Sequence, residues 1–514
     1  MSKTIIIIGA GLAGLSAALQ AAENGCNVKL VSSLPSERAQ SVMAEGGINA
    51  ALNTKDENDS PEEHFTDTIK AACGLADPNA VWGMTQAAPE LVHWLLKLGV
   101  KFNMSGYDDV DLRNFGGQKK KRTAFAQSDT GKQIMTAMID AVRRKEAFGM
   151  VERFNHHSFL TLRLCGNICC GCVIRDEYSQ ETVELPGDAV IVATGGMHGL
   201  FGNTTGSLSN TGEVTAELFR LGVPLANGEM IQYHPTTVKC GGKRMLISEA
   251  ARGEGGKLFA MKDGKQWYFM EEKYPELGNL MPRDITAREI WKVSHESEVF
   301  LDMTEISEEI ISNKLSGLAD DCMTYLHKDI RKEPVSVLPG IHYFMGGILV
   351  DEQHRTPIQN LYAAGECCAQ YHGANRLGGN SLLGALYGGR VAAKSACEQA
   401  DVVDLSCATQ IDFPPASQIS EIKQLNKVMQ ETMGVVRNEN TLLNGIQTVQ
   451  ALTGNLPLLG MAVLKSALAR KESRGAHWRE DYPKSNDNDY LKTTVARFDG
   501  KQIQISFVPV PERR

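Results

Sequence analysis

The chain has 514 residues, which at roughly 150 residues per domain suggests two to four domains, and its hydrophobic and charged fractions of 42% and 22% are ordinary for a globular protein. A net charge of −8 without a basic stripe argues against a nucleic-acid partner. No window of about 18 uninterrupted apolar residues occurs, so no direct membrane span is predicted. The 12 cysteines lack the pattern of a small disulfide scaffold and are expected to be reduced thiols of a cytoplasmic protein.

The first elements along the chain form a βαβ unit. Residues 4–8 are an apolar strand, residues 12–24 an alanine-rich helix, and residues 27–31 a second strand, with the glycine-rich turn GAGLAG between the first strand and the helix. This arrangement is the required context for a dinucleotide-binding fingerprint.

Each glycine of the fingerprint has its own task. Gly9 makes the turn, Gly11 admits a pyrophosphate close to the backbone, and Gly14 lets the helix pack on the strand, with the helix N-terminus facing the phosphates. The acidic residue expected at the end of the second strand is replaced by Ser32 and Ser33, whose hydroxyl groups can still bond a ribose.

Two later strands return to the same predicted sheet. The stretch DAVIVATGG at 188–196 is typical of two-domain flavoproteins, and IQNLYAAGECC at 358–368 contains a strand that ends in Ala-Gly-Glu. Three strands of one sheet that lie as far apart in the sequence as residues 4–8, 188–196 and 358–368 indicate one nucleotide-binding domain with an insertion. The insertion is expected at residues 228–342.

Two conspicuous clusters are interpreted as structural. LCGNICCGCVI contains Cys165, Cys169, Cys170 and Cys172, but this spacing does not match the usual zinc or iron–sulfur patterns, so a β-hairpin turning at Gly-Asn is favoured over a metal site. The basic run at residues 119–122 is interpreted as a solvated loop, with guidance of an anionic substrate as the alternative.

Nine motifs, in order, carry a resemblance to a known family: SVMAEGGINAAL, FGGQKKKRTAFAQSDTG, QYHPTT, SEAARGEGG, MPRDI, HYFMGG, GECC, HGANRLGGNSL and ESRGAHWREDYP. Over nearly its whole length the chain resembles the flavoprotein subunit of fumarate reductase and succinate dehydrogenase. L-Aspartate oxidase belongs to the same superfamily and is the main alternative. A non-catalytic flavoprotein that relays electrons or scaffolds a complex is a further one.

The resemblance implies an α/β fold in three parts. A Rossmann-like FAD-binding domain is interrupted by an α+β capping domain and followed by a helical C-terminal domain, in which residues 440–471 are expected to be packed helices. The predicted boundaries are 1–227 with 343–402 for the FAD-binding domain, 228–342 for the capping domain, and 403–514 for the C-terminal domain with its tail.

FAD is the expected cofactor, and no metal site is predicted. The covalent members of the family carry a flavin-linking histidine where this chain has Gln40, so the resemblance implies non-covalent FAD and a modest preference for fumarate reduction. The residues predicted to hold FAD are Gly9, Gly11, Gly14, Ser32, Ser41, Gly46, Gly47, Ala193, Thr194, Gly195, Glu366, Ser381 and Leu382.

A dicarboxylate substrate needs cationic or donor groups at both ends. Arg376, His234 and His342 lie in glycine- or proline-marked loops, and arginine matches a carboxylate bidentately. The resemblance adds the Ser248 hydroxyl as a substrate contact. It also places Phe115 where L-aspartate oxidase has a glutamate facing the substrate amine, which favours fumarate or succinate.

The proton donor of the family is an arginine, and MPRDI places Arg283 at the matching position. Because arginine is a poor acid, with a pKa above about 12, it needs a relay that reprotonates it. The resemblance implies Glu249 and Arg252 in that role, whereas a surface Glu–Arg pair three residues apart on a helix is the plain alternative.

The chain contains no motif for a second flavin or an iron–sulfur cluster. Electrons are therefore expected to come from another component, with an iron–sulfur or other electron-transfer subunit favoured. The expected location is cytoplasmic, with docking at the inner face of the membrane through such a partner as the alternative.

Overall fold

A computed structural model describes residues 2–107, 109–400, 411, 413 and 418–514. Its central element is a parallel sheet with strand order β20-β10-β1-β2-β6. The three predicted nucleotide-sheet regions thus meet in one sheet, because β10 and β20 pair in register with the strands of the N-terminal βαβ unit. The strands are β1 (Thr4–Ile8), β2 (Asn27–Ser32), β6 (Val151–Asn155), β10 (Ala189–Val192) and β20 (Leu361–Ala363).

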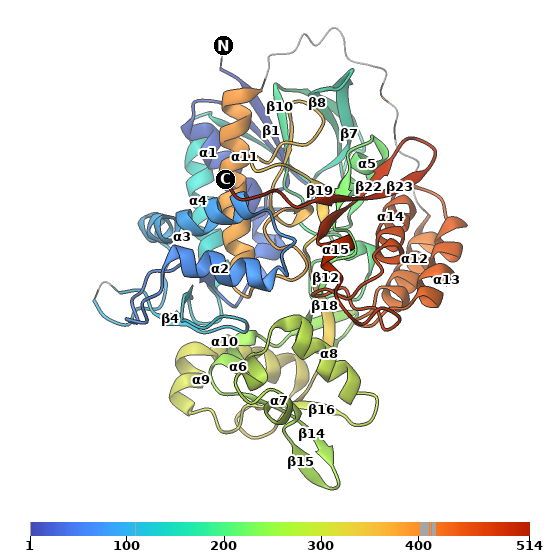
Figure 1. Cartoon of the computed structure of the whole chain (residues 1–514). Coiled ribbons are helices and arrows are strands. Elements are labelled where there is room, and N and C mark those ends of the chain that lie inside the picture. The colour runs from blue at the N-terminus through green and yellow to red at the C-terminus, as the bar shows by residue number, and fades with distance from the viewer. Residues whose placement is uncertain (1, 108, 401–410, 412, 414–417) are drawn as a thin grey trace.

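Successive isoleucines of β1 pack into cores on opposite faces of this sheet. Ile5 and Ile7 belong to a core shared with helices, whereas Ile6 and Ile8 belong to a core shared with a second sheet. A strand covered on both faces is an uninterrupted apolar run, as TIIII is. Figure 1 shows α1, α4 and α11 together on one side of the sheet. The helices are α1 (Leu12–Glu23), α2 (Pro61–Ala71), α3 (Pro78–Leu98), α4 (Thr130–Ala147) and α11 (Asn380–Gln399).

The second sheet consists of β7 (His157–Cys165), β8 (Ile168–Asp176) and β9 (Thr182–Pro186). The predicted hairpin is confirmed, because β7 and β8 pair antiparallel around a turn in which Gly166 has a φ of 59°. Cys165 is disulfide-bonded, which corrects the expectation that every cysteine is reduced. The ten other cysteines within the described ranges are free thiols.

The capping domain is the yellow-green body below the FAD-binding sheet in Figure 1. It has its own apolar core, which includes Leu258, Leu301 and Val335. Strands β12 and β18 pair antiparallel and connect this body to the rest of the chain. Its elements are β12 (Ile231–Cys240), β13 (Lys243–Leu246), α6 (Glu249–Gly253), β14 (Lys257–Lys262), β15 (Lys265–Trp267), α7 (Phe269–Lys273), α8 (Arg283–Val293), β16 (Val299–Asp302), α9 (Glu308–Lys314), α10 (Ser316–Asp321), β17 (Val335–Ser336) and β18 (Leu338–Phe344).

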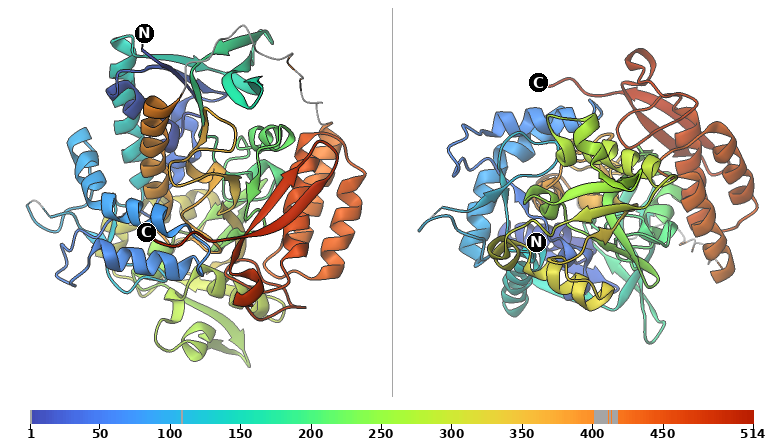
Figure 2. Two further views of the ribbon diagram at one scale, coloured as in Figure 1. Left: turned by 45° about the horizontal axis from the view of Figure 1, so that its top comes forward. Right: turned by 90° about the horizontal axis from the view of Figure 1, so that it is seen from below.

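The C-terminal part is helical only at first. Helices α12 (Ile419–Thr432), α13 (Glu439–Gln450) and α14 (Asn455–Ala469) confirm the predicted helices, and Figure 2 shows them on a different side of the molecule from the capping domain. A short helix, α15 (Asp487–Tyr490), follows. Beyond it, β22 (Lys492–Phe498) and β23 (Ile503–Pro509) form a hairpin that the sequence analysis overlooked.

The terminal hairpin belongs to a sheet of order β21-β19-β11-β22-β23. Its other strands come from the middle of the chain, so the last strands pack beside elements more than two hundred residues away. The remaining short elements are β3 (Ile48–Asn49), β4 (Leu112–Arg113), β5 (Thr123–Ala124), α5 (Glu213–Arg220), β11 (Leu225–Ala226), β19 (Gly347–Leu349) and β21 (Cys368–Ala369).

The predicted domain boundaries stay predictions. Much of the stretch from 403 to 417, where the C-terminal domain was expected to begin, lies outside the described residues. Within the part of the chain that is described, no helix is long and apolar enough to cross a membrane.

Candidate active site

One cavity of about 610 Å³ gathers nearly all the predicted site residues. Both the FAD-binding sheet and the capping domain line it, so residues far apart in the sequence share its wall. Only Gly14 and Arg252 among the predicted residues are not in the lining. The lining includes Gly9, Gly11, Ser32, Ser41, Gly46, Gly47, Phe115, Ala193, Thr194, Gly195, His234, Ser248, Glu249, Arg283, His342, Glu366, Arg376, Ser381 and Leu382.

Two of the three fingerprint glycines, Gly9 and Gly14, have no room for a side chain. Gly9 has a φ of +113°, and a Cβ there would lie 2.2 Å from the carbonyl oxygen of Ala193. A Cβ on Gly14 would lie 1.8 Å from the carbonyl oxygen of Gly9. Gly11 instead faces the cavity, because the nearest atom to its Cβ position is Ser41 Oγ at 3.6 Å. Gly14 therefore stands behind the cavity wall and holds helix and strand together.

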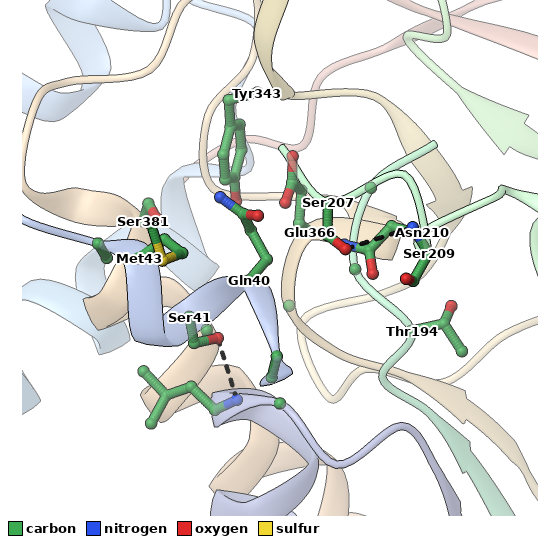
Figure 3. A pocket seen from close by; sticks show the side chains of 18 of the residues that line it. Gln40, Ser41, Met43, Thr194, Ser207, Ser209, Asn210, Tyr343, Glu366 and Ser381 are labelled. Carbon is green, nitrogen blue, oxygen red and sulfur yellow. Dashed lines mark hydrogen bonds between the residues drawn. The ribbon is translucent and has the colours of Figure 1, made fainter. Parts of the chain in front are cut away.

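Two helices begin at the cavity, and each has a glycine at its N-cap. α1 begins after Gly11 and α11 after Gly379, so neither helix is capped by the side chain of its own N-cap residue. The backbone N–H of Leu12 donates to Ser41 Oγ at 3.2 Å; the dashed line at Ser41 in Figure 3 marks this hydrogen bond. Uncapped N–H groups and helix dipoles favour anionic groups such as phosphates. The glycine-lined wall and these helix ends fit an FAD pyrophosphate.

Gln40 projects into the cavity toward Tyr343 in Figure 3. It lies in the lining with its neighbour Ser41 and with Met43. An amide side chain cannot form the covalent flavin bond that an imidazole forms, so the residue at this place in the wall is compatible with FAD held by non-covalent contacts.

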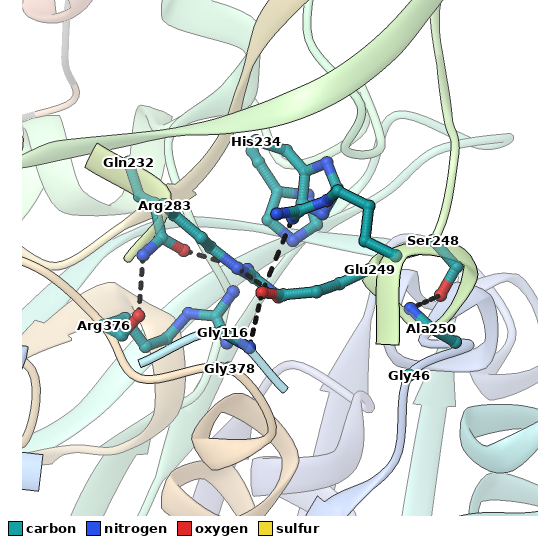
Figure 4. Close-up of polar contacts among 12 residues, drawn as sticks. Gly46, Gly116, Gln232, His234, Ser248, Glu249, Ala250, Arg283, Arg376 and Gly378 are labelled. Carbon is teal, nitrogen blue, oxygen red and sulfur yellow. Dashed lines mark hydrogen bonds and ion pairs between the residues drawn. The ribbon is translucent and has the colours of Figure 1, made fainter. Parts of the chain in front are cut away.

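Arg283, Glu249 and Arg252 form a buried cluster, drawn in part in Figure 4. Arg283 Nε donates to Glu249 Oε2 at 2.7 Å, and its Nη2 donates to the same oxygen. Arg252 Nη2 lies 3.5 Å from Glu249 Oε1, which also accepts from the backbone N–H of Gly116 at 3.0 Å. The helical Glu–Arg pair is thus buried at 2% and 3% exposure, which argues against the surface-pair alternative.

The protonation of this cluster follows from its charges. Burial acts to raise the pKa of the Glu249 carboxyl, but the Arg283 and Arg252 guanidinium groups and the hydrogen bonds from Arg283 and Gly116 lower it overall below its ordinary value. Glu249 is therefore a carboxylate at neutral pH. Burial lowers the pKa of Arg252.

Arg376, His234 and His342 face the cavity, where their ring and guanidinium nitrogens can bond a ligand. Arg376 Nε and His234 Nε2 are buried and have no hydrogen-bond partner among the described residues. The Arg376 guanidinium carbon lies 4.3 Å from the centroid of the Tyr343 ring, and the two histidine rings lie 5.1 Å apart. A buried donor without a partner is costly unless a ligand satisfies it.

Both histidines are neutral at physiological pH. Burial and the Arg283 charge lower the pKa of His234 and of His342 well below the ordinary value. Burial, followed by the charge of Arg283, also lowers the pKa of Arg376, to about 9. The positive charges of the cavity therefore repel one another, and a bound anion would relieve that repulsion.

Ser248 and Phe115 complete the wall near the cluster. Ser248 caps α6, with its Oγ accepting from the backbone N–H of Ala250 at 3.4 Å. Phe115 is 2% exposed, and its ring lies against the Cα positions of Gly46 and Gly378, where added Cβ atoms would clash with it. Phe115 presents an apolar ring here, and the Glu249 carboxylate lies beside that ring at Gly378.

Two side chains that the sequence analysis missed, those of Gln232 and Thr205, support the predicted ones. Gln232 Oε1 accepts from Arg283 Nη1 at 3.1 Å, while its Nε2 donates to the backbone oxygen of Arg376 at 2.8 Å. Thr205 Oγ1 lies 2.8 Å from His342 Nδ1. Gln232 stands two residues before the histidine of QYHPTT, a position that could have drawn attention; nothing in the sequence marks Thr205.

A buried amide network fixes the loop that carries Arg376. Asn49 Nδ2 donates to the backbone oxygen of Gly378 at 2.7 Å and to Asn380 Oδ1 at 2.8 Å. Thr123 Oγ1 donates to Asn49 Oδ1 at 2.6 Å. These hydrogen bonds hold the loop in place although it is rich in glycine.

The basic run at 119–122 is only partly solvated, which corrects its interpretation as a solvated loop. Arg122 has no exposed surface and forms ion pairs with Asp59 at 2.8 Å and with Asp67 at 3.0 Å. Arg122 is absent from the cavity lining, and so are the three lysines before it. The last residue of the run therefore holds α2 and the preceding loop in place.

The fold and this site define an FAD-dependent oxidoreductase: a Rossmann-like domain with a glycine-lined cavity, capped by a second domain. Residues 4–382 match the family described as "FAD binding domain", and residues 452–513 match "Fumarate reductase flavoprotein C-term". The chain belongs to the succinate dehydrogenase and fumarate reductase flavoprotein family.

The similarity to individual relatives extends over nearly the full length of both chains. The chain is 37% identical to the "Succinate dehydrogenase flavoprotein subunit" of Bacillus subtilis, covering 100% of this chain and 98% of the relative, and 31% identical to the "L-aspartate oxidase" of Streptomyces coelicolor, covering 100% and 94%. A mutant FrdA chain of Escherichia coli quinol fumarate reductase superposes with a TM-score of 0.90 at 27% identity, covering 99% of this chain and 97% of that one.

Proposed function

We propose that this flavoprotein interconverts fumarate and succinate, with Arg283 as the proton donor and acceptor. One observation carries the proposal: Arg283 and Arg376 line one cavity, where Arg283 is paired with Glu249 but the Nε of Arg376 is buried without a hydrogen-bond partner among the described residues. An anionic group of a substrate would satisfy that donor. The family membership points to the same substrates.

Arg376 would hold one carboxylate of the substrate. Its unpaired Nε lies in the lining, and a charge-assisted hydrogen bond contributes about 1.5–3 kcal/mol. His234 Nε2, His342 and the Ser248 hydroxyl would bind the other carboxylate as neutral donors. Two carboxylates held apart in this way would be twisted out of conjugation with the central bond, which would make fumarate a better hydride acceptor.

FAD, when bound, supplies the hydride exchange with the substrate carbon. Gly9, Gly11 and the N-termini of α1 and α11 would hold its pyrophosphate, and Ser32 and Glu366 would bond its sugar hydroxyls. With Gln40 in the wall, we propose that all these contacts are non-covalent.

Proton delivery needs a group aimed at the adjacent carbon. Arg283 lines the cavity, and its three guanidinium nitrogens are held in place by donating to Glu249 and Gln232. After Arg283 releases a proton, the Glu249 carboxylate and Arg252 behind it would return one. Arg252 also donates to the backbone oxygen of Asn279 at 2.6 Å, which holds it in line.

L-Aspartate oxidation is the second candidate, because one full-length relative has that name. Phe115 speaks against it. An apolar ring offers the ammonium group of aspartate no partner, whereas it suits an unsubstituted methylene or vinyl carbon. A purely electron-relaying flavoprotein would not need Arg283, His234 and Arg376 to converge on one cavity.

Electrons would come from a separate iron–sulfur or other electron-transfer subunit. The name of the Bacillus subtilis relative describes a flavoprotein subunit, and the Escherichia coli structure is a quinol fumarate reductase. We propose a cytoplasmic location, or docking at the inner membrane face through that partner.

The deciding experiment compares substrates on the purified, FAD-loaded chain. Reduced viologen should be oxidised rapidly on addition of fumarate, and succinate should reduce an artificial acceptor. L-Aspartate with oxygen should yield little hydrogen peroxide. If aspartate were oxidised faster than fumarate is reduced, the L-aspartate oxidase assignment would replace this one.

A further inference from the structure

Two thiols meet on the surface opposite the cavity ends of α1 and α11. Cys26 lies in the loop that joins α1 to β2, and Cys397 lies near the C-terminal end of α11. Their Sγ atoms are 2.9 Å apart although 371 positions separate them in the sequence. Both are free cysteines, and neither belongs to the cavity described above.

The surroundings of this pair expose one thiol and shield the other. Cys26 is 7% exposed, whereas Cys397 is partly exposed and lines a shallow surface pocket. Lys3 Nζ donates to the backbone oxygen of Cys397 at 2.8 Å. A small oxidant therefore reaches Cys397 first and finds Cys26 directly behind it. The pocket is completed by Gln20, Asn24, Lys394 and Glu398.

This pairing is unlike the environment of the other free thiols. Cys73, Cys169, Cys170 and Cys367 each donate to a backbone carbonyl oxygen. Among the described free cysteines, Cys26 and Cys397 are the pair whose sulfurs contact each other. A disulfide bond is about 2.0 Å long, so closure requires the sulfurs to approach by roughly 0.9 Å.

We propose that Cys26 and Cys397 form a reversible disulfide that fastens the end of α11 to the end of α1 when a peroxide is present. The Cys397 thiolate attacks the peroxide oxygen and becomes a sulfenic acid, and hydroxide leaves. The Cys26 sulfur then attacks the Cys397 sulfur and displaces the second oxygen as water. The two cysteines lose two electrons and two protons, and hydrogen peroxide is reduced to two molecules of water.

The crosslink would join the two helices whose N-termini form the cavity wall. α1 and α11 already pack closely: Ser16 Oγ donates to the backbone oxygen of Leu386 at 2.6 Å, and a Cβ on Gly389 would lie 2.3 Å from the backbone oxygen of Ala13. A bond at their far ends restricts separation of the pair and so resists unfolding of the FAD-binding domain.

The rate of closure should depend strongly on pH. Burial, followed by the hydrogen bond with Cys26, raises the pKa of Cys397 to about 12. The charged groups around the pair are Lys3, Lys394 and Glu398. Because only the thiolate attacks peroxide, the rate should rise about tenfold per pH unit between pH 7 and 9.

Mass mapping of the FAD-loaded protein tests the bond directly. The protein is treated with hydrogen peroxide, its remaining thiols are alkylated, and it is cut with trypsin and a glutamate-specific protease. Cys26 then lies in the fragment 24–29 and Cys397 in the fragment 395–398, each without another cysteine. The expected product is these two fragments linked, with the link lost on treatment with dithiothreitol.

Variants give an independent measurement. Peroxide should raise the apparent Tm of the wild-type protein by about 2–6 °C, and dithiothreitol should reverse the change. Cys397→Ser and Cys26→Ala should each abolish the peroxide-dependent shift. Cys73→Ser, a partly exposed cysteine without a thiol neighbour, should retain it.

The mapping can also overturn the proposal without any variant. If peroxide left both fragments alkylated, converted Cys397 to a sulfinic acid, or linked either cysteine to a different partner, the pair would not be a reversible disulfide site. A peroxide-dependent shift that survived in Cys397→Ser would lead to the same conclusion.

Discussion

The guanidinium of Arg283 contacts two partners and still reaches the cavity, a geometry that a lysine cannot reproduce. Arg283→Lys keeps the positive charge but loses the planar fork that bonds Glu249 and Gln232 at once. We expect turnover of fumarate to fall by roughly 10²–10⁴, the usual effect of removing a positioned general acid, with KM within a few-fold of the wild-type value. Steady-state assays with saturating reduced viologen near neutral pH measure both constants.

Arg376→Lys is the matched control, because it alters the proposed carboxylate clamp and not the proposed proton donor. Its main effect should be a higher KM for fumarate, with any loss of kcat accompanying it. Glu249→Gln should slow turnover while leaving binding nearly intact. If Arg283→Lys retained most of its turnover, proton delivery would have to be assigned to another group, although the clamp could stand.

The ring of Phe115 sets the character of the cavity wall near Gly46 and Gly378. Phe115→Glu places a carboxylate beside an anionic substrate, so we expect KM for fumarate to rise by about tenfold or more, the equivalent of at least ~1.4 kcal/mol. Phe115→Leu, which keeps the wall apolar, should raise KM much less. Equal KM values for the two variants would show that this position does not select the substrate.

We expect Gln40 to leave FAD bound without a covalent link. Since an amide cannot replace the imidazole that bonds a flavin, acid precipitation of the protein should release FAD into the supernatant. Absorbance at the flavin maximum before and after precipitation measures the released fraction. A yellow, fluorescent protein band on a denaturing gel would contradict the expectation.

At the scale of elements, the close contact of α1 with α11 depends on a glycine. A Cβ on Gly389 would lie 2.3 Å from the backbone oxygen of Ala13, so Gly389→Ala must push the helices apart. We expect the free energy of unfolding to fall by about 1–3 kcal/mol, the usual cost of overpacking. Thermal melts should show it as a lower Tm. Gly242→Ala, at a site with no atom within 4 Å of the added Cβ, should leave Tm nearly unchanged.

Elements with a local signal were predictable from the sequence, and those that depend on distant partners were not. The strand at 4–8 and the helix after it follow from an apolar run and a glycine fingerprint, and both are present. Strand β22 was overlooked because it pairs with β11, far away in the chain, and β23 pairs in turn with β22. Arg122 is buried only because α2 and the loop before it supply Asp59 and Asp67.

In the candidate site, too, the residues that lie in motifs were predictable from the sequence, whereas the contacts between distant segments were not. Arg283, Arg376 and the two histidines were found because each lies in a motif that resembles a family, and the structure brings them into one cavity. The contacts among these residues could be learned only from the folded structure. The bridge that Gln232 makes between Arg283 and the backbone of Arg376 joins three separate segments, so no spacing rule predicts it.

At the scale of the whole molecule, stability should depend on pH through Glu45, a carboxyl group of the cavity wall with other acidic groups near it. Burial, followed by the charge of Asp321, raises the pKa of Glu45 to about 8, while Arg113 opposes the shift and Asp129 adds to it. Glu45 Oε2 is buried without a hydrogen-bond partner among the described residues. Because the folded state retains a proton that the unfolded state has lost, Glu45 favours folding at low pH, and this contribution falls as pH rises from about 4.5 to 8.

Glu45→Gln should remove that part of the pH dependence. Between pH 6 and 8 the wild-type protein should lose up to about 2–3 kcal/mol that the variant keeps, so the Tm of Glu45→Gln minus that of wild type should increase over this interval. Melts of the FAD-free protein in matched buffers provide the comparison. A Tm difference that stayed constant with pH would mean that Glu45 titrates in its ordinary range.

The pairing of β11 with β22 constrains the order in which the chain can fold during synthesis. Leu225 and Ala226 find their partners in Ala496 and Val495, so the ribosome must have added some 270 further residues before this sheet can form. Until then one edge of β11 has no strand to pair with, and an unpaired edge is an aggregation hazard. A nascent or truncated chain that ends before residue 492 lacks β22 and leaves this edge of β11 unpaired. We therefore expect such a chain to need a chaperone to prevent aggregation, even though its FAD-binding glycines are already present.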